Sequence, residues 1–146
     1  MTLASAIDDI LPGRTLPVIN VDTAPFFEAA AEGRLVLQRC KETGRFQWYP
    51  RACSIYTFGE VEWVEASGKG RVYSFTIVRN NAVDPVFRDL VPYAIGLIEL
   101  PEGVRMMGNI TGCDLKDIHV GMEVEVYFAP MNADRSIHMP FWKPAA

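Results

Sequence analysis

Cys40-Lys41-Glu42-Thr43-Gly44 and Tyr49-Pro50-Arg51-Ala52-Cys53-Ser54-Ile55-Tyr56 are the two segments that decide the fold. They have the layout of the paired knuckles of a zinc ribbon, in which each knuckle supplies two ligands in a C-x2-C pattern. Each knuckle keeps its first cysteine, Cys40 or Cys53, whereas Thr43 and Tyr56 occupy the second ligand positions. Structural zinc needs four Cys or His ligands, and two thiolates cannot supply that tetrahedron. The sequence therefore predicts a ribbon remnant without bound metal.

Cys40 and Cys53 are most simply interpreted as two relic thiols that the ribbon fold brings near each other. Free cysteine packs well as a small hydrophobic residue, which favours this interpretation. Two alternatives remain: a redox pair, or two ligands of a metal site that Cys113 or a partner completes. The ring of Tyr56 could fill the space that the metal left.

The segments around the knuckles predict one short helix and three strands. Thr23 can cap the helix, Pro25 suits its first turn, and Gly33 suits the residue just beyond its end. The strands of the ribbon are predicted at residues 35–39, 46–49 and 61–64.

Five further strands are predicted at residues 71–79, 93–100, 104–110, 123–128 and 137–142. In the first of them, alternation places Val72, Ser74, Thr76 and Val78 on one face and the residues between them on the other. The link between the third and fourth strands is long, at residues 112–121, and a single helical turn is predicted within it at 114–118. Five strands with the long link in that place are the layout of an OB-fold barrel.

The predicted fold class is therefore mainly β: a short helix and a rubredoxin-like zinc-ribbon remnant, followed by a five-stranded OB-fold barrel. We expect an extended arm at residues 1–22, the helix and ribbon-like region at 23–66, and the OB-fold domain with its C-terminal tail at 67–146.

Composition excludes several classes of partner. The 146 residues carry a net charge of −4 and a pI near 5.2, whereas nucleic-acid binders normally present a basic surface. No window approaches the roughly 20 apolar residues of a membrane span, and the N-terminus lacks the features of a secretory signal. We expect a cytoplasmic protein with reduced thiols that binds neither nucleic acid nor membrane.

In order and spacing, the chain resembles the acyl-CoA-associated OB-fold proteins, a family long catalogued as a domain of unknown function (type thirty-five). The resemblance covers roughly residues 24 to 143. It is carried by Phe26-Phe27-Glu28, Gly33-Arg34-Leu35, Cys40 with Gly44, Tyr49-Pro50-Arg51 with Cys53, Gly70-Arg71-Val72-Tyr73-Ser74-Phe75-Thr76, Val91-Pro92-Tyr93, Glu99-Leu100-Pro101-Glu102-Gly103, Val120-Gly121-Met122-Glu123-Val124 and Pro140-Phe141.

The resemblance implies an accessory partner of thiolase-like enzymes, which completes the channel for a CoA thioester in lipid or steroid metabolism. It also implies structural zinc in typical members, from which this chain departs at Thr43 and Tyr56. We therefore expect no cofactor. The expected partner is a thiolase-like subunit that shares its acyl-CoA substrate with this chain.

The expected site residues belong to binding surfaces and not to a catalytic centre. Arg79 and Arg88, at the ends of the 80–89 link, could contact the anionic CoA moiety. A partner interface is expected at the aromatic and apolar positions Trp48, Tyr49, Pro50, Arg51, Phe141 and Trp142.

Three classes of function follow, in decreasing order of support. The first is an accessory subunit of a thiolase, a synthase or a retro-aldolase, not catalytic alone. The second is a stand-alone OB-fold module that binds single-stranded nucleic acid or a small ligand, since OB-folds also stack bases on aromatic side chains. An independent enzyme comes third, because Cys113, His119 and His138 are separated in sequence and offer no assembled nucleophile and base.

Overall fold

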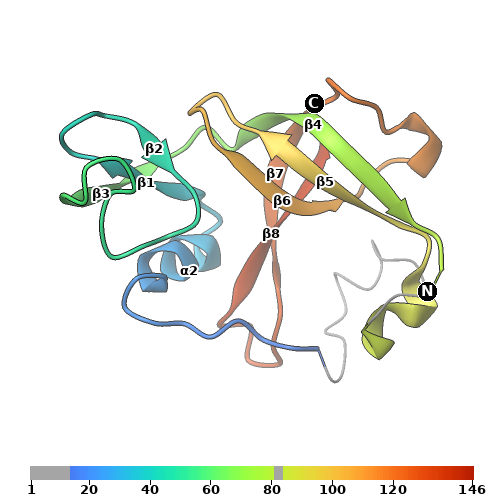
Figure 1. Cartoon of the computed structure of the whole chain (residues 1–146). Helices are drawn as coiled ribbons and strands as arrows, with labels where there is room; N and C mark the ends of the chain where they lie inside the picture. The colour runs from blue at the N-terminus through green and yellow to red at the C-terminus, as the bar shows by residue number, and fades with distance from the viewer. Residues whose placement is uncertain (1–13, 81–83) are drawn as a thin grey trace.

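The computed structural model describes residues 14–80 and 84–146 of the chain (Figure 1). A small sheet with one helix forms one part, and a closed barrel of five strands forms the other (Figure 1). The first 13 residues of the predicted arm, and residues 81–83 of the link between the first two barrel strands, lie outside the described residues. No helix in the described part has the length and apolar character needed to cross a bilayer.

Helix α2 (Ala24–Ala31) is short and has one buried face. Pro25 lies in its first turn, and Gly33 follows its end with a φ of 77°, where a side chain would be strained. Thr23 precedes the helix as predicted, but its Oγ1 accepts a hydrogen bond from the Asn20 amide (3.0 Å) and makes no cap to α2. Phe26 is buried on the inner face of the helix.

The ribbon sheet has the order β2–β1–β3, and all its pairs are antiparallel. The strands are β1 (Val36–Cys40), β2 (Phe46–Gln47) and β3 (Val61–Glu65). Three strands were predicted here. The second was predicted to run to residue 49 but ends at Gln47, because Trp48 and Tyr49 leave the sheet and line a cleft.

The barrel closes in the order β4–β5–β6–β8–β7, as an OB-fold does. Its strands are β4 (Lys69–Val78), β5 (Tyr93–Glu99), β6 (Arg105–Ile110), β7 (Glu123–Pro130) and β8 (His138–Pro144). Two short 3₁₀ helices lie in the links, η1 (Pro85–Leu90) and η2 (Leu115–Asp117). The five-strand prediction is thus confirmed.

Strand β4 corrects the predicted alternation. A β-bulge shifts the register between Val72 and Ser74, so that two residues of β4 oppose one residue of β5. Val72 is buried, but Ser74 and Thr76 beyond the bulge are exposed. A single period-2 pattern along β4 was therefore wrong, because the bulge turns the second half of the strand over.

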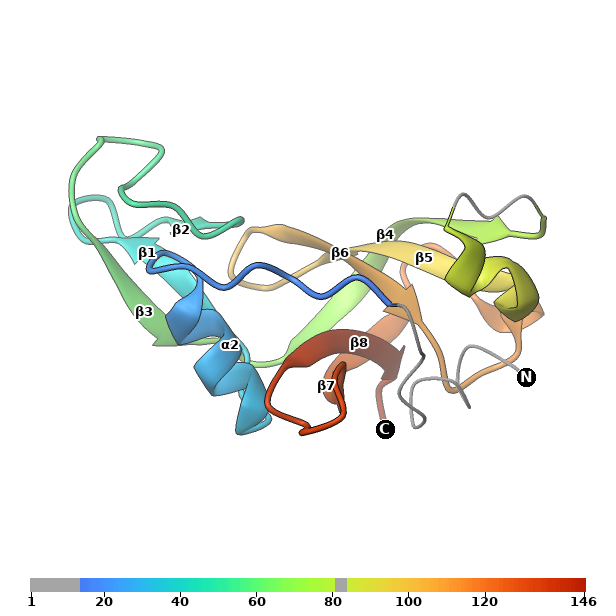
Figure 2. The same cartoon turned by 90° about the horizontal axis from the view of Figure 1, so that it is seen from below.

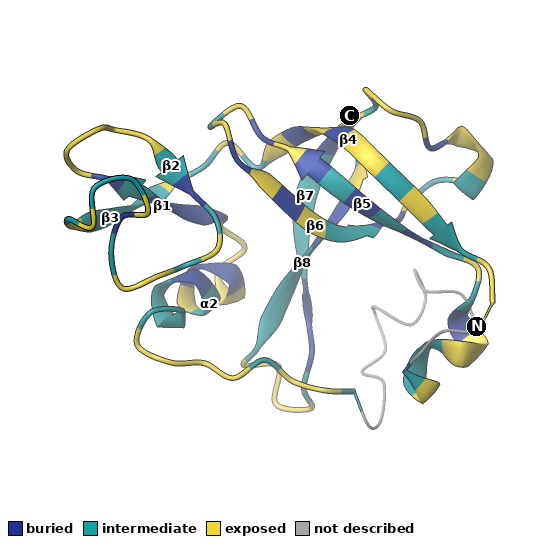
Figure 3. Cartoon of the chain, viewed as in Figure 1, coloured by how far each residue is buried: buried dark blue, intermediate teal, exposed yellow. Residues whose placement is uncertain are grey.

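One core joins the two parts. Phe26 and Leu37, from the helix and the ribbon, belong to the same buried cluster as Ile98, Met106 and Trp142 of the barrel. Figure 3 shows buried residues on one face of α2 and on strands of both the ribbon sheet and the barrel. The ribbon and the barrel therefore share a hydrophobic core.

Phe141 and Trp142 lie inside this fold and do not form a docking tail. They are 2% and 0% exposed, and both belong to strand β8, which pairs with β7 along its length. A Cβ added to Gly108 would lie 2.9 Å from Trp142 Cδ1, so the indole packs directly on the β6 backbone. The chain buries both rings itself, so they do not project as an exposed docking tail, and Phe141 instead lines an apolar cleft.

Candidate functional site

Two buried glutamines, Gln38 of β1 and Gln47 of β2, hold the loop that follows β2. Gln47 Nε2 donates to Gln38 Oε1 (2.8 Å) and to the Cys53 carbonyl (3.1 Å), while Gln47 Oε1 accepts from the Ile55 amide (2.9 Å). Gln38 Nε2 donates to the Arg51 carbonyl (2.8 Å), and Gln38 Oε1 accepts from the Arg51 amide (2.9 Å). Because buried polar atoms require partners, these bonds fix the loop on the sheet.

An apolar cleft of about 380 Å³ lies between α2, this loop and the strands β6 and β8. The Phe26 ring is centred 5.1 Å from Trp48, and Trp48 is 5.1 Å from Tyr49, so three aromatic rings line one wall. The full lining is Arg14, Thr23, Phe26, Phe27, Trp48, Tyr49, Pro50, Met106, Met107, Gly108, Asn109, Met139, Pro140 and Phe141.

Arg14 supplies the charge in this lining. Its guanidinium carbon lies 5.7 Å from the centre of the Phe87 ring and 5.8 Å from that of Phe141. Burial lowers the pKa of Arg14. The segment that carries it runs from α2 along the barrel (Figure 2). Among the described residues its lining has one cation and no carboxylate, thiol or imidazole, so the cleft is suited to binding an apolar group.

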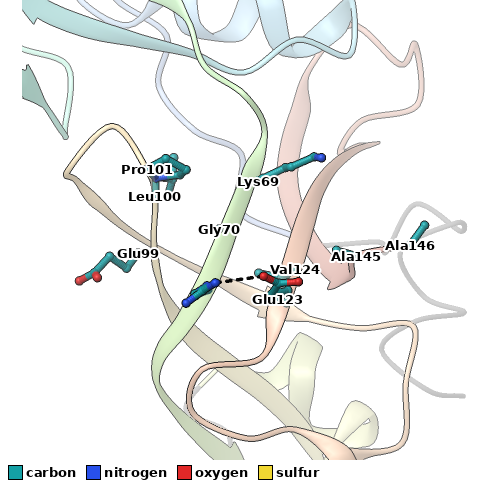
Figure 4. A pocket seen from close by; sticks show the side chains of 10 residues that line it. Lys69, Gly70, Glu99, Leu100, Pro101, Glu123, Val124, Ala145 and Ala146 are labelled. Atoms are coloured by element: carbon teal, nitrogen blue, oxygen red, sulfur yellow. Dashed lines mark hydrogen bonds and ion pairs between the residues drawn. The ribbon is translucent and has the colours of Figure 1, made fainter.

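A second hollow lies along β4 and β7 near the C-terminus (Figure 4). Arg71 Nη2 pairs with Glu123 Oε1 at 3.1 Å across it, and both side chains are largely exposed. Lys69 and Glu99 add one charge of each sign to the lining. Because the charges are mixed and partly paired, this groove is not a coherent anion site.

The structure brings together some of the predicted binding residues and separates others. Trp48, Tyr49 and Pro50 line the cleft, and Arg51 follows them as an exposed residue. Arg79 and Arg88 are exposed at the two sides of the β4–β5 link, and neither lines the cleft.

The three residues weighed as catalytic groups were Cys113, His119 and His138, and the Nδ1 of His138 is buried with no hydrogen-bond partner among the described residues. Burial raises the pKa of Cys113, and the carboxylates of Asp117 and Asp114 raise it further, so the thiolate is disfavoured. His119 is exposed, and its Nδ1 lies 2.8 Å from the Asp117 carbonyl oxygen. Within residues 14–80 and 84–146, no three His, Cys, Asp or Glu side chains gather as a metal-binding group.

The Cys40 thiol lies among hydroxyl groups. Hydrogen bonds from Ser54 and then Thr43 and Thr57 lower its pKa to about 6, because they stabilise the thiolate. Thr57 Oγ1 lies 3.6 Å from Cys40 Sγ. The neighbours of Cys40 from the second knuckle are thus Ser54 and Thr57, in place of the predicted Cys53 and Tyr56.

Cys53 and Tyr56 have other roles. The Cys53 carbonyl accepts a bond from Gln47 (3.1 Å). The Tyr56 hydroxyl donates to the Phe46 carbonyl (2.7 Å), and the guanidinium carbon of Arg45 lies 3.9 Å from the centre of its ring. A set of one thiol and three hydroxyls does not fit structural zinc, which takes thiolate and imidazole ligands.

Comparison with known proteins places both parts of the chain. A family model described as "ChsH2, rubredoxin-like zinc ribbon domain" matches residues 27–54, and one described as "ChsH2, C-terminal OB-fold domain" matches residues 63–129. A DUF35 domain-containing scaffold protein of Methanocaldococcus jannaschii is 36% identical over 104 residues, which cover 68% of this chain and 71% of that protein. The chain belongs to the DUF35 family.

Two other similar proteins are named as subunits of CoA enzymes. This DUF35 chain is 38% identical over 134 residues to a Thermomonospora curvata protein named "Probable enoyl-CoA hydratase alpha subunit", and the match covers 90% of the chain but 40% of that relative. It thus spans less than half of that relative's length. It is 29% identical over 98 residues to the benzoylsuccinyl-CoA thiolase subunit BbsA of Geobacter metallireducens, covering 66% of the chain and 64% of BbsA.

A solved structure named "Ltp2-ChsH2(DUF35) aldolase" contains a chain similar to this DUF35 protein. The TM-score is 0.78 at 33% identity, and the match covers 90% of this chain and all of that one (100%). The family predicted from the sequence, a rubredoxin-like ribbon with an OB-fold, is confirmed.

Sequence reasoning missed Gln38, Gln47, Ser54 and Thr57. Gln38 carried a signal, since it follows the apolar run Leu35-Val36-Leu37 in a buried strand, where a polar side chain needs partners. Ser54 was masked by Cys53, the residue just before it.

Proposed function

We propose that this chain is a non-catalytic accessory subunit of a thiolase-superfamily enzyme that acts on acyl-CoA. The partner would be a thiolase, a synthase or a retro-aldolase of lipid or steroid metabolism, and would supply the nucleophile and bases. This chain would supply interface area and part of the wall of the channel for the CoA thioester or its acyl group.

The apolar cleft is the observation that carries this proposal. Five aromatic side chains and one half-buried cation line it, and among the described residues its lining holds no carboxylate, thiol or imidazole. A site of this chemistry can hold an acyl chain or an apolar side chain of a partner, but it cannot activate a thioester by itself. The names of the relatives, a CoA-thiolase subunit and a CoA-hydratase alpha subunit, support the same class of substrate.

The loop Trp48–Arg51 is proposed as part of the partner interface. Tyr49 is 57% exposed although it lies at the rim of the cleft, and large aromatic side chains of this kind are common in interface centres. The glutamine pair fixes this loop before a partner binds, which lowers the entropy cost of association.

Arg79 and Arg88 are proposed as contacts for the phosphates of CoA. Both are exposed cations beside the β4–β5 link, where they could approach the outer end of a CoA bound to the partner. Replacing both with Glu should raise the KM of the complex for acyl-CoA and leave the amount of complex unchanged.

A nucleic-acid-binding OB module is the second class of function, and charge argues against it. On the β5–β6 face, Arg105 pairs with Glu99 (2.9 Å), and its guanidinium also lies 3.6 Å from the centre of the Tyr73 ring. With a net charge of −4, the chain lacks the basic groove that follows a phosphate backbone. We expect no salt-sensitive affinity for oligonucleotides.

An affinity pull-down of the tagged chain from its host, read by mass spectrometry, tests the proposal. We expect a thiolase-superfamily subunit in near-equal amount, and we expect the co-expressed pair to turn over an acyl-CoA. Tyr49→Ala with Arg51→Ala should reduce co-purification, while Val120→Ala, an exposed position outside the cleft lining, should not. A chain that emerges alone as a stable species, or a partner fully active without it, would overturn the proposal.

We also propose that this chain binds no cofactor and no structural zinc. We further propose that the protein is cytoplasmic and does not contact membranes. The division of the chain into an arm (1–22), a helix and ribbon-like region (23–66) and an OB-fold domain with its tail (67–146) is part of the same proposal. The three free cysteines, Cys40, Cys53 and Cys113, support a reducing compartment.

A further inference from the structure

The two knuckles of the ribbon are the same structure made twice. In the first, the Cys40 amide donates to the Arg45 carbonyl and the Gly44 amide donates to the Cys40 carbonyl, both at 2.8 Å. In the second, the Ser54 amide donates to the Gly59 carbonyl and the Phe58 amide to the Ser54 carbonyl, both at 2.9 Å. The offset between the two patterns is the same at every step: 40, 44 and 45 correspond to 54, 58 and 59.

The side chains and dihedral angles repeat with the same offset. Thr43 Oγ1 accepts from the Arg45 amide (3.2 Å), and Thr57 Oγ1 accepts from the Gly59 amide (3.1 Å). Gly44 and Phe58 both have a left-handed φ, 72° and 59°. Four features, namely two main-chain hydrogen bonds, one threonine hydrogen bond and one left-handed φ, therefore align Cys40 with Ser54 and Thr43 with Thr57.

These four residues meet in one place. Thr57 Oγ1 lies 3.6 Å from Cys40 Sγ, within hydrogen-bonding reach, and the hydroxyls of Ser54 and Thr43 lie close enough to the Cys40 thiol to lower its pKa. Ser54 is fully buried (0% exposed), and its Oγ also accepts from the amides of Tyr56 (3.1 Å) and Thr57 (3.4 Å). One sulfur and three hydroxyl oxygens from the two knuckles thus lie together.

We infer that Cys40, Thr43, Ser54 and Thr57 are the four metal positions of this ribbon, and that in this chain their hydrogen bonds close the knuckles in place of zinc. The inference differs from the spacing of the cysteines, which pairs Cys40 with Cys53. It also means that the stability of the two knuckles does not depend on a metal, whichever partner the chain binds.

Two variants distinguish the two registers. The first carries Thr43→Cys, Ser54→Cys and Thr57→Cys, which places thiols at all four inferred corners. The matched control carries Thr43→Cys and Tyr56→Cys, which places thiols at 40, 43, 53 and 56. Both are purified with a non-thiol reductant, and zinc per chain is measured after dialysis against a weak chelator. Cobalt(II) is then titrated, because tetrahedral thiolate coordination gives it characteristic visible bands.

We expect about one zinc per chain in the first variant, far less in the control, and essentially none in the wild type. Wild-type protein should also keep its melting temperature in strong chelator. One zinc retained by the wild type overturns the inference, as does stoichiometric tetrahedral binding by the control. If the first variant does not fold, the wild-type zinc content and chelator response still decide whether the ribbon is metal-free.

Removing single hydroxyls tests the hydrogen-bonded cluster and its register. Ser54→Ala should lower the denaturation midpoint of the metal-free protein, because it removes a buried partner of Cys40 and of two amides. Cys53→Ala, one residue away, should leave the midpoint close to that of the wild type. The reverse order would place Cys53 in the cluster and overturn the inference.

Discussion

Phe58 is held in a left-handed conformation that its side chain disfavours, while its amide donates to the Ser54 carbonyl (2.9 Å). Its φ is 59°, in the left-handed region where the first knuckle has Gly44, and its side chain is 84% exposed. A left-handed non-glycine residue costs about 1–2 kcal/mol. We therefore propose that the exposed Phe58 ring contributes to binding the partner subunit and not to the stability of the chain itself.

Phe58→Gly should therefore separate stability from function. Removing the left-handed strain should gain about 1–2 kcal/mol, while the greater freedom of glycine in the unfolded chain costs about 0.5–1 kcal/mol, so the free energy of unfolding should stay equal or rise by up to ~1.5 kcal/mol. Urea denaturation measures this. Binding to the partner subunit, measured by co-purification or titration, should weaken.

Arg135→Gly is the matched control for this prediction. Arg135 also has a positive φ, 58°, but lies in the β7–β8 turn. It should show a similar effect on stability and none on the partner. If Phe58→Gly destabilises the chain by more than about 1 kcal/mol, Phe58 packs within the fold and its proposed role in binding is wrong.

The loop after β2 depends on two side chains of the sheet that carries it. Gln47→Leu keeps the volume but leaves the Ile55 amide and the Cys53 carbonyl without the partners that Gln47 provides. Both groups are part-buried, so each lost bond should cost about 1 kcal/mol or more, near the lower end of the range for buried groups, and a loss of about 2 kcal/mol is expected from urea denaturation. Hydrogen exchange at the Ile55 amide should become faster.

Arg51→Ala is the control for the loop, because Gln38 binds only main-chain atoms of Arg51. Its stability should lie within about 0.5 kcal/mol of the wild type. Equal losses in the two variants would mean that the Arg51 side chain, and not the amide network, fixes the loop.

The sequence predicted most elements of this fold and missed the details that place the site. Hydrophobic alternation located the first and fourth barrel strands, a nearly continuous apolar run located the second, and turn residues marked the starts of the other two. It could not show the β4 bulge, where one extra residue reverses the pattern after Val72. It also could not fix the register of the second knuckle. Phe58 stands there where the first knuckle has Gly44, and Cys53 lies one residue before Ser54, the residue that corresponds to Cys40.

At the scale of the whole molecule, the ribbon has no core of its own. Leu37 of β1 is fully buried (0% exposed) in the cluster that includes Ile98 and Trp142 of the barrel. Because neither part can leave the other without exposing this cluster, we expect the described chain to unfold in one step although it has two architectures. A metal-free ribbon would depend on this shared core, since no zinc stabilises it separately.

The three tryptophans allow this expectation to be measured in each part. Trp142→Phe leaves Trp48 and Trp63, which report on the ribbon, whereas replacing those two with Phe leaves Trp142 as a probe of the barrel. Urea transitions followed by fluorescence in the two variants should each coincide with the transition seen by far-UV circular dichroism in the same variant.

Leu37→Ala, added to each tryptophan variant, tests whether the two parts are coupled. Truncating this buried leucine should cost about 2–5 kcal/mol, and the barrel probe should register the same loss as the ribbon probe although Leu37 belongs to the ribbon. Leu16→Ala, at a 40% exposed position, should change stability by less than about 0.5 kcal/mol. A shift confined to the ribbon probe would show that the barrel is stable alone. The ribbon would then be a separately unfolding attachment, and its hydroxyl cluster would have to hold it without help from the barrel.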